Sequence, residues 1–252
     1  MIAVLGSLLC SSGVAQQPTA DEQKRTLGVA RNVSIDYTRK LPDFICTEQV
    51  ERTDRTGSNN VQTDRLTMEL TYFGQKEKQK LVTINGAPTQ ENLASQDGLI
   101  TGGEFGSLLL GVFDPSSSAD FRWKESSTIR KRRVTVYTYS IARAKSHYEV
   151  GHRAGNGGMV EAAAGYHGEV AFDMETNRVL RLTALADDIP KETGILQSSM
   201  QVDYDFIDIA GRSYLLPSRS EAHMERGHRQ ITNVVDFIGY RKFEADSTIS
   251  FK

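Results

Sequence analysis

Histidine is the side chain best suited to metal binding or to proton transfer near neutral pH. The sequence contains five histidines, which are His147, His152, His167, His223 and His228. His223 and His228 are five residues apart, and this odd spacing places them on opposite faces of a strand, where they make poor co-ligands. A composite site with His147 or His167 would need the tertiary fold, and solvated histidines at strand edges are the simpler interpretation. We therefore predict no metal and no cofactor.

Two pairs of carboxylates have the residue types for acid and base catalysis. Asp187 and Asp188 are adjacent in an expected loop, and Asp203 and Asp205 alternate on the polar face of an expected strand. A glycosidase uses such a pair, but nothing selects these carboxylates over the other acids. The sequence also has no G-x-S-x-G, Walker, H-E-x-x-H or C-x-x-C motif. We expect no enzymatic activity, and a hydrolase is the third functional hypothesis.

Two further stretches have the residues to contact charged groups. The glycines of residues 102–106 could offer backbone N–H groups to an anion, although a simple helix-entry turn explains them as well. Residues 130–133 are the one dense basic run. This run could contact lipid head groups or an acidic partner protein. In the alternative interpretation, Arg130 and Arg132 face water on an edge strand, where charge opposes aggregation.

Composition limits the partners of this chain. A quarter of the residues are charged, 38% are hydrophobic and the formal net charge is −2. This balance gives no overall attraction to nucleic acid or to an anionic membrane. No internal stretch has the eighteen or so consecutive apolar residues of a membrane-spanning helix. We expect a monomer with at most peripheral membrane contact and no nucleic-acid partner.

The first residues differ in composition from the rest. Residues 1–15 are apolar and then small, as in a secretory signal peptide that ends at Ala15, but no positive charge precedes the apolar run. Residues 16–22 then form a polar linker, and one domain spans residues 23–252. Cys10 raises the alternative of a lipid-modified cysteine. Cleavage after Ala15 would leave only Cys46, which we expect to be buried.

The elements that must position any site are mainly strands. Residues 166–225 alternate apolar and polar side chains in two successive hairpins, a pattern typical of an antiparallel sheet with one buried face. An amphipathic helix spans residues 21–41 and ends at Pro42, and a second, short helix lies within residues 102–115. Residues 151–165 are expected to be a flexible loop. In all, we predict about nine to eleven antiparallel strands in a single curved sheet.

This order of elements resembles a known superfamily. A leading amphipathic helix, a long meander, a short apolar helix and the hairpin G-E-V-A-F-D-M-E-T-N-R-V-L-R-L at residues 168–182 resemble the bacterial periplasmic lipoprotein carriers (LolA/LolB-like and LppX-like). The likeness spans residues 21–251. The chain is also similar to uncharacterised exported bacterial proteins with the segments L-P-D-F-x-C (residues 41–46) and Y-R-K-F-x-A-x-S-x-I-x-F (residues 240–251).

The resemblance implies an unclosed half-barrel whose concave apolar face lies under a helical lid. It also implies an exported protein, periplasmic or associated with the outer membrane, that binds a lipid, an acyl chain or a lipoprotein. Envelope proteins are the expected protein partners. The alternative is a non-catalytic structural or interaction module of the envelope with a filled core. The residues that we expect to line an apolar cavity are Leu70, Tyr72, Trp123, Phe172, Leu182, Tyr204 and Phe206. Alternation alone cannot tell a cavity wall from a packed core.

Overall fold

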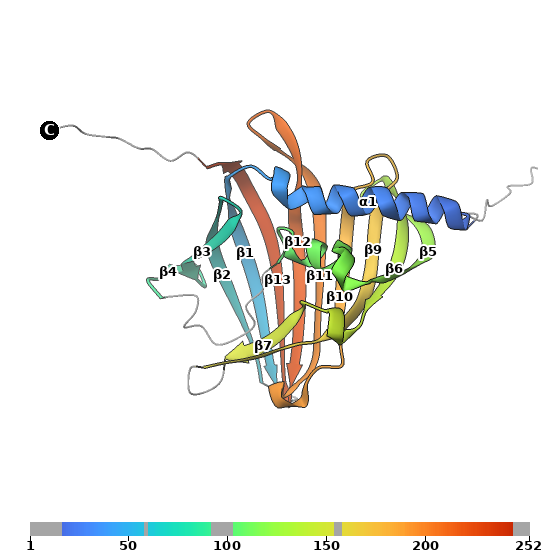
Figure 1. Ribbon diagram of the computed structural model, residues 1–252. Helices are drawn as coiled ribbons and strands as arrows, with labels where there is room; N and C mark the ends of the chain where they lie inside the picture. The colour runs from blue at the N-terminus through green and yellow to red at the C-terminus, as the bar shows by residue number, and fades with distance from the viewer. Residues whose placement is uncertain (1–16, 58–59, 92–102, 154–157, 244–252) are drawn as a thin grey trace, which may run out of the picture.

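The protein folds as a single open sheet with two helices over one face. The computed structural model describes residues 17–57, 60–91, 103–153 and 158–243. Eleven antiparallel strands form one sheet that does not close into a barrel (Figure 1). The predicted mainly β fold, with a leading helix and a short helix in mid-chain, is therefore confirmed. The expected signal peptide at residues 1–15 lies outside the described residues.

The eleven strands follow the chain except at one junction. Their bounds are β1 Phe44–Thr56, β2 Asn60–Phe73, β3 Lys76–Ile84, β4 Ala87–Pro88, β5 Asp120–Ile129, β6 Arg132–Ile141, β9 Gly165–Asp173, β10 Val179–Asp187, β11 Ile195–Ile209, β12 Arg212–Arg226 and β13 Arg229–Lys242. Their order across the sheet is β4-β3-β2-β1-β13-β12-β11-β10-β9-β6-β5. The first strand therefore pairs with the last, and Val50 lies opposite Val235.

Short turns set the register of the hairpins. Asn85 and Gly86 have φ angles of 50° and 82°, and Ala210 and Gly211 have φ angles of 52° and 78°. Two consecutive residues in this left-handed region are characteristic of the tight turn that matches the twist of hairpin strands. Both turns were predicted from the sequence. Pro88, which cannot donate to a ladder, ends the edge strand β4.

The long helix α1 spans Ala20–Lys40. It begins with a capping box, in which Thr19 and Glu22 satisfy each other's backbone N–H groups. The helix thus begins one residue before its predicted start at residue 21 and includes the end of the expected linker. The helix ends before Pro42, as predicted, because a residue that precedes proline disfavours the helical conformation. Among the described residues, no helix has the length and apolar character to cross a membrane.

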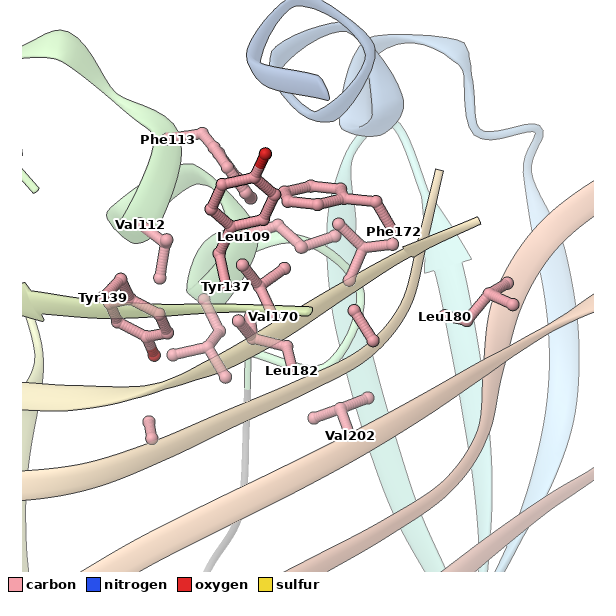
Figure 2. Close-up of a cluster of buried hydrophobic side chains, with 14 of the residues drawn as sticks. Leu109, Val112, Phe113, Tyr137, Tyr139, Val170, Phe172, Leu180, Leu182 and Val202 are labelled. Atoms are coloured by element: carbon pink, nitrogen blue, oxygen red, sulfur yellow. The ribbon is translucent and has the colours of Figure 1, made fainter. Parts of the chain in front are cut away.

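The short helix α2 spans Ser107–Phe113 and ends at Asp114 and Pro115, as predicted. It lies on the same face of the sheet as α1 (Figure 1). Figure 2 shows its side chains Leu109 and Phe113 against Val170 and Phe172 of the sheet, inside one cluster of buried apolar residues. A seven-residue helix cannot persist alone in water. Its stability therefore comes from docking on the sheet.

The expected flexible loop at residues 151–165 is wrong in part. Two short strands, β7 (Glu149–Arg153) and β8 (Met159–Ala163), pair as a separate two-stranded sheet. The glycines in this segment predict a loop. Gly151, however, lies inside β7, where a Cβ atom would approach the carbonyl oxygen of Val160 to 2.8 Å. It marks a close contact between strands instead.

The expectation that Arg130 and Arg132 simply face water is also corrected. Residues 130 and 131 form the turn between β5 and β6 with positive φ angles. The Arg132 guanidinium donates to Asp173 at 2.5 Å, and Arg130 lies 3.4 Å from Asp205. Sequence reasoning missed these ion pairs because the acids belong to strands about 40 and 75 residues away.

Candidate functional site

A cleft of about 430 Å³ opens between α1, α2 and the ends of β10 and β12, and we call it the α1 cleft. Its apolar wall consists of Val33, Tyr37, Leu41, Leu109, Val179 and Leu215. Its polar wall includes Asn32, Asp36, Lys40, Thr176, Arg178 and Ser213. An apolar wall with a few polar groups at one side is the usual composition of a site for a small organic ligand.

The helix α1 forms the roof of this cleft. Ala30 and Ser34 are fully buried, while Leu27, Ile35 and Tyr37 are partly buried against the sheet core. This 3-4 spacing is the stripe that an amphipathic helix presents to its support. The stripe thus contacts both the sheet core and α2.

The floor of the cleft is held by polar contacts to the segment that enters α2. The Tyr204 hydroxyl of β11 donates to the carbonyl oxygen of Glu104 at 3.0 Å. The Ser220 hydroxyl of β12 donates to the Glu104 carboxylate at 3.2 Å. Both contacts are buried, so each bond is made away from competing water. They fix Leu109, which is carried by α2, over the middle of the sheet.

Arg178 stands in the polar wall at the start of β10. Its guanidinium carbon lies 5.8 Å from the centre of the Phe206 ring, and that of Arg132 lies 4.9 Å from the same ring. Arg132 is neutralised by Asp173 and Glu175. Arg178, in contrast, forms no ion pair within the described residues. It is a positioned cation without a matching acid.

The turn that carries Thr176 and Arg178 is anchored by Asp173. Burial alone would raise the pKa of Asp173, but hydrogen bonds from Arg132 and from the backbone and hydroxyl of Thr176 lower this pKa to about 2. The carboxylate thus stays ionised at neutral pH. Because it holds Thr176 at 2.8 and 2.9 Å, it fixes the edge of the cleft.

Tyr37 contributes a hydroxyl group with no hydrogen-bond partner among the described residues. Its ring lies edge-on to Tyr204 with 6.1 Å between centroids. Burial raises the pKa of the Tyr37 hydroxyl, so the group remains a donor at all physiological pH values. Leaving such a group unpaired costs about 1–3 kcal/mol. A ligand acceptor that reached this hydroxyl would recover part of that free energy.

The seven residues predicted to line a cavity lie in or against the packed core. Leu70, Tyr72, Phe172, Leu182 and Tyr204 are buried, and Trp123 and Phe206 are partly buried. In the described structure none of the seven lines the α1 cleft. Three of them adjoin its wall, since Tyr204 contacts Tyr37, Phe206 lies under Arg178, and Phe172 pairs with Val179. Their role in ligand binding stays a prediction.

Sequence reasoning missed the polar wall. Arg178 and Ser213 follow turns that the sequence identified, Asp173–Asn177 and Ala210–Gly211. A polar side chain just after a turn is usually solvated, so nothing marked these two. Val33 and Leu41 fit the helical spacing of residues 21–41, but periodicity shows which face of a helix is covered and not how tightly.

Comparison with solved structures finds distant likenesses of fold. The chain is similar to a putative outer membrane lipoprotein-sorting protein domain from Vibrio parahaemolyticus, with 9% identity, a TM-score of 0.42, and coverage of 90% of this chain and 94% of that one. It is also similar to a LolA superfamily protein from Nitrosomonas europaea, with 10% identity, a TM-score of 0.37, and coverage of 91% and 97%.

A third similar structure is the lipoprotein LppX from Mycobacterium tuberculosis, with 10% identity, a TM-score of 0.27, and coverage of 84% of this chain and 94% of that one. No protein-family model matches the chain, and no curated protein matches it. The likenesses are fold-level. At these values they carry no inference about function.

The carboxylates and histidines that drew attention in the sequence are held in other contacts. Asp203 accepts from Arg181 at 2.5 Å and Asp205 lies near Arg130, so neither acid faces a nucleophile. Asp187 contacts His167 at 2.6 Å. Within the described residues, no group of three or more histidine, cysteine and acidic side chains could hold a metal ion.

A second hollow of about 560 Å³ lies on the opposite face of the sheet. Its walls include His167, Glu169, Gln201, Glu221 and His223. Three of these already have partners, as His167 contacts Asp187, Glu169 contacts Lys124 at 2.6 Å, and His223 contacts Thr232 at 3.1 Å. These polar side chains are therefore satisfied within the protein, and Tyr139, Leu185 and Met200 also line the hollow.

Proposed function

We propose that this protein binds a hydrophobic small molecule, a lipid or an acyl chain, between α1 and the concave face of the half-barrel, and that it catalyses no reaction on this ligand. The α1 cleft carries the proposal. Its volume of about 430 Å³ falls within the range of roughly 300–1,000 Å³ typical of small-molecule sites. Its apolar wall would remove a chain from water at a gain of about 25 cal/mol per Å².

The small side chains of Ala30 and Ser34 under α1 support the same proposal, because they bury little apolar area. If α1 lifts, the cleft extends over side chains that are now buried directly below the helix and α2, including Phe172, Leu182 and Tyr204. These belong to the set predicted from the sequence. We propose that they become ligand contacts in an open state, while the α1 cleft is the part of the site that remains when the lid is closed.

We also propose, from the apolar segment 1–15, that the protein is exported and works in the periplasm or at the outer membrane. Export would bring the chain into contact with membrane lipids and lipid-modified proteins. A carrier that shields an apolar chain from water is useful in that setting, because the free energy of exposing the chain is large.

A second candidate function is an interaction module with a filled core. The observation in its favour is the tight packing of Phe172, Leu182 and Tyr204, each at most 1% exposed. Such packing leaves no space for a ligand between these side chains. In this case the protein would act through its surface and would bind no lipid.

Native mass spectrometry of the mature protein, purified from a bacterial periplasm, separates the two candidates. We expect an adduct at one ligand per chain, which solvent extraction would then identify. A clean apo mass that persists after incubation with lipids would overturn the carrier proposal and favour the filled module.

A pair of substitutions on α1 locates the site. Val33→Trp fills the cleft from its roof and should abolish the adduct. Val29→Trp is the matched control, because Val29 is 47% exposed and lies outside the cleft wall. Equal adduct levels in both variants would show that the ligand binds elsewhere.

A further inference from the structure

We propose that the ligand of the α1 cleft is a single-chain amphiphile whose head group is an anion, a carboxylate or a phosphate, and that Arg178 binds this head group. The inference rests on the proposed function, since it names the class of molecule that the same site accepts. It adds a polar specificity that a purely apolar cavity would not have.

The charges of the cleft wall favour an anion. Three ionisable side chains with a full charge line it, and these are Asp36, Lys40 and Arg178. Asp36 and Lys40 neutralise each other in an ion pair of 2.7 Å along the exposed side of α1. Arg178 is left as one net positive charge in the wall. A cationic head group at this position would meet the guanidinium at close range and be repelled.

The Arg178 side chain is already positioned for such a contact. It is half-buried, and its guanidinium carbon lies 5.8 Å from the centre of the Phe206 ring, which Arg132 also contacts. A guanidinium is planar and preorganised, so it loses little conformational entropy for each hydrogen bond that it forms. Its planar set of donors matches the two oxygens of a carboxylate or a phosphate. The ring contact thus prepares Arg178 for an acceptor that the described structure does not supply.

The other residues of the cleft wall are a polar group and an apolar group. Ser213 offers an uncharged hydroxyl donor in the wall that also contains Arg178, whereas the Thr176 hydroxyl already donates to Asp173. Leu109 and Leu215 face the cleft on its apolar side. A volume of about 430 Å³ lies near the lower end of the usual range for small-molecule sites. It therefore suits one chain with a compact head group better than a lipid with several chains.

The test compares four ligands that share a twelve-carbon chain and differ in the head group. These are laurate, dodecyl phosphate, neutral monolauroylglycerol and cationic dodecyltrimethylammonium. Their affinities for the whole protein are measured by isothermal titration calorimetry below their micelle concentrations. We expect one or both anions to bind about tenfold to a hundredfold more tightly than the neutral and cationic ligands. The two anions show whether a carboxylate or a phosphate is preferred.

Variants of one residue then assign the preference. Arg178→Gln should reduce the affinity for the preferred anion to that of monolauroylglycerol and leave the neutral ligand unchanged. Arg178→Lys keeps the charge and should retain much of the preference. Arg133→Gln, which removes an exposed arginine outside the cleft, should behave as the unmodified protein. Thermal unfolding of each variant verifies that the fold is intact.

The outcomes separate the two proposals. If none of the four ligands binds, the proposed function itself is overturned. If all four bind with similar affinity and Arg178→Gln changes nothing, the cleft binds apolar chains and the head-group inference fails alone. If Arg178→Gln does not fold, the test depends on the unmodified protein and on Arg178→Lys. The inference is overturned if these two proteins show no preference for an anion.

Discussion

Glu48 places a carboxyl group on the buried face of β1, between the apolar residues Cys46 and Val50. It is 2% exposed on the concave face of β1, and both of its oxygens accept from the Gln79 side chain at 3.0 Å. Burial raises the pKa of Glu48 to about 7. The Gln79 hydrogen bond opposes this shift, and the charges of Glu104 and Glu77 add to it. The unfolded chain would titrate near its usual value of 4.5.

This shift makes stability fall as pH rises. Between about pH 4.5 and pH 7 the folded protein keeps a proton that the unfolded chain has lost, so raising the pH favours unfolding. The full penalty, reached above pH 7, is about 3 kcal/mol. Glu48→Gln removes the titrating group and keeps a partner for Gln79.

We expect Glu48→Gln to have a free energy of unfolding close to that of the unmodified protein at pH 4.5 and up to about 3 kcal/mol higher at pH 8. Urea denaturation at both pH values measures this difference. Glu51→Gln, on the exposed face of the same strand, is the control and should change little. Parallel pH profiles for Glu48→Gln and the unmodified protein would contradict the argument.

At the scale of elements, α1 decides whether the cleft is open. The helix is well capped and ends at a proline, so its own geometry is stable. The stripe that faces the core combines Leu27 and Tyr37 with Ala30 and Ser34, and the last two bury little apolar area. We propose that this helix separates from the sheet without unfolding.

We therefore predict that enlarging Ala30 loosens the lid. Ala30→Phe forces a large ring into a site with no exposed surface and should cost about 1–3 kcal/mol of stability. The dissociation rate of a bound twelve-carbon amphiphile, followed by stopped-flow, should increase. Val29→Phe on the exposed side of the same helix should leave both quantities unchanged. An unchanged dissociation rate in a destabilised Ala30→Phe protein would show that α1 is not the gate.

At the scale of the whole molecule, the sheet is held together by a junction between the ends of the chain. β1 pairs with β13 from Phe44 opposite Lys242 to Thr56 opposite Arg229. The two strands lie far apart in the sequence, so a long loop must close before they can pair. We therefore expect slow folding. The β7–β8 hairpin, in contrast, pairs only with itself.

Hydrogen exchange should reproduce this architecture. We predict the slowest amide exchange in interior strands such as β1, β12 and β13, which have a partner on both sides and lie away from the two edges. The edge strand β4 and the β7–β8 hairpin should exchange fastest among the strands. Mass spectrometry of peptic fragments gives the order directly. Equal protection of β7–β8 and the central strands would show that the hairpin is part of the main cooperative unit.

The sequence by itself determined the local structure. Alternation located most strands and their buried faces, as in Val202 and Tyr204, because a strand has a period of two. Asn85-Gly86 and Pro42 located a turn and a helix end, since each limits the backbone over a few residues. Cys46 was expected to be buried, and it is free and buried in β1. The hairpin at residues 149–163 was missed because its strands are short and rich in small residues.

Only the tertiary structure decided where those elements meet. The pairing of β1 with β13 and the ion pair of Arg132 with Asp173 depend on contacts between distant parts of the chain, which no local pattern contains. The same holds for the cleft. Burial of Phe172 or Leu182 was readable from alternation, but whether another side chain or a ligand covers such a residue depends on how α1 and α2 lie on the sheet. Arg178 has its proposed role in binding a head group only because the fold brings it under α1.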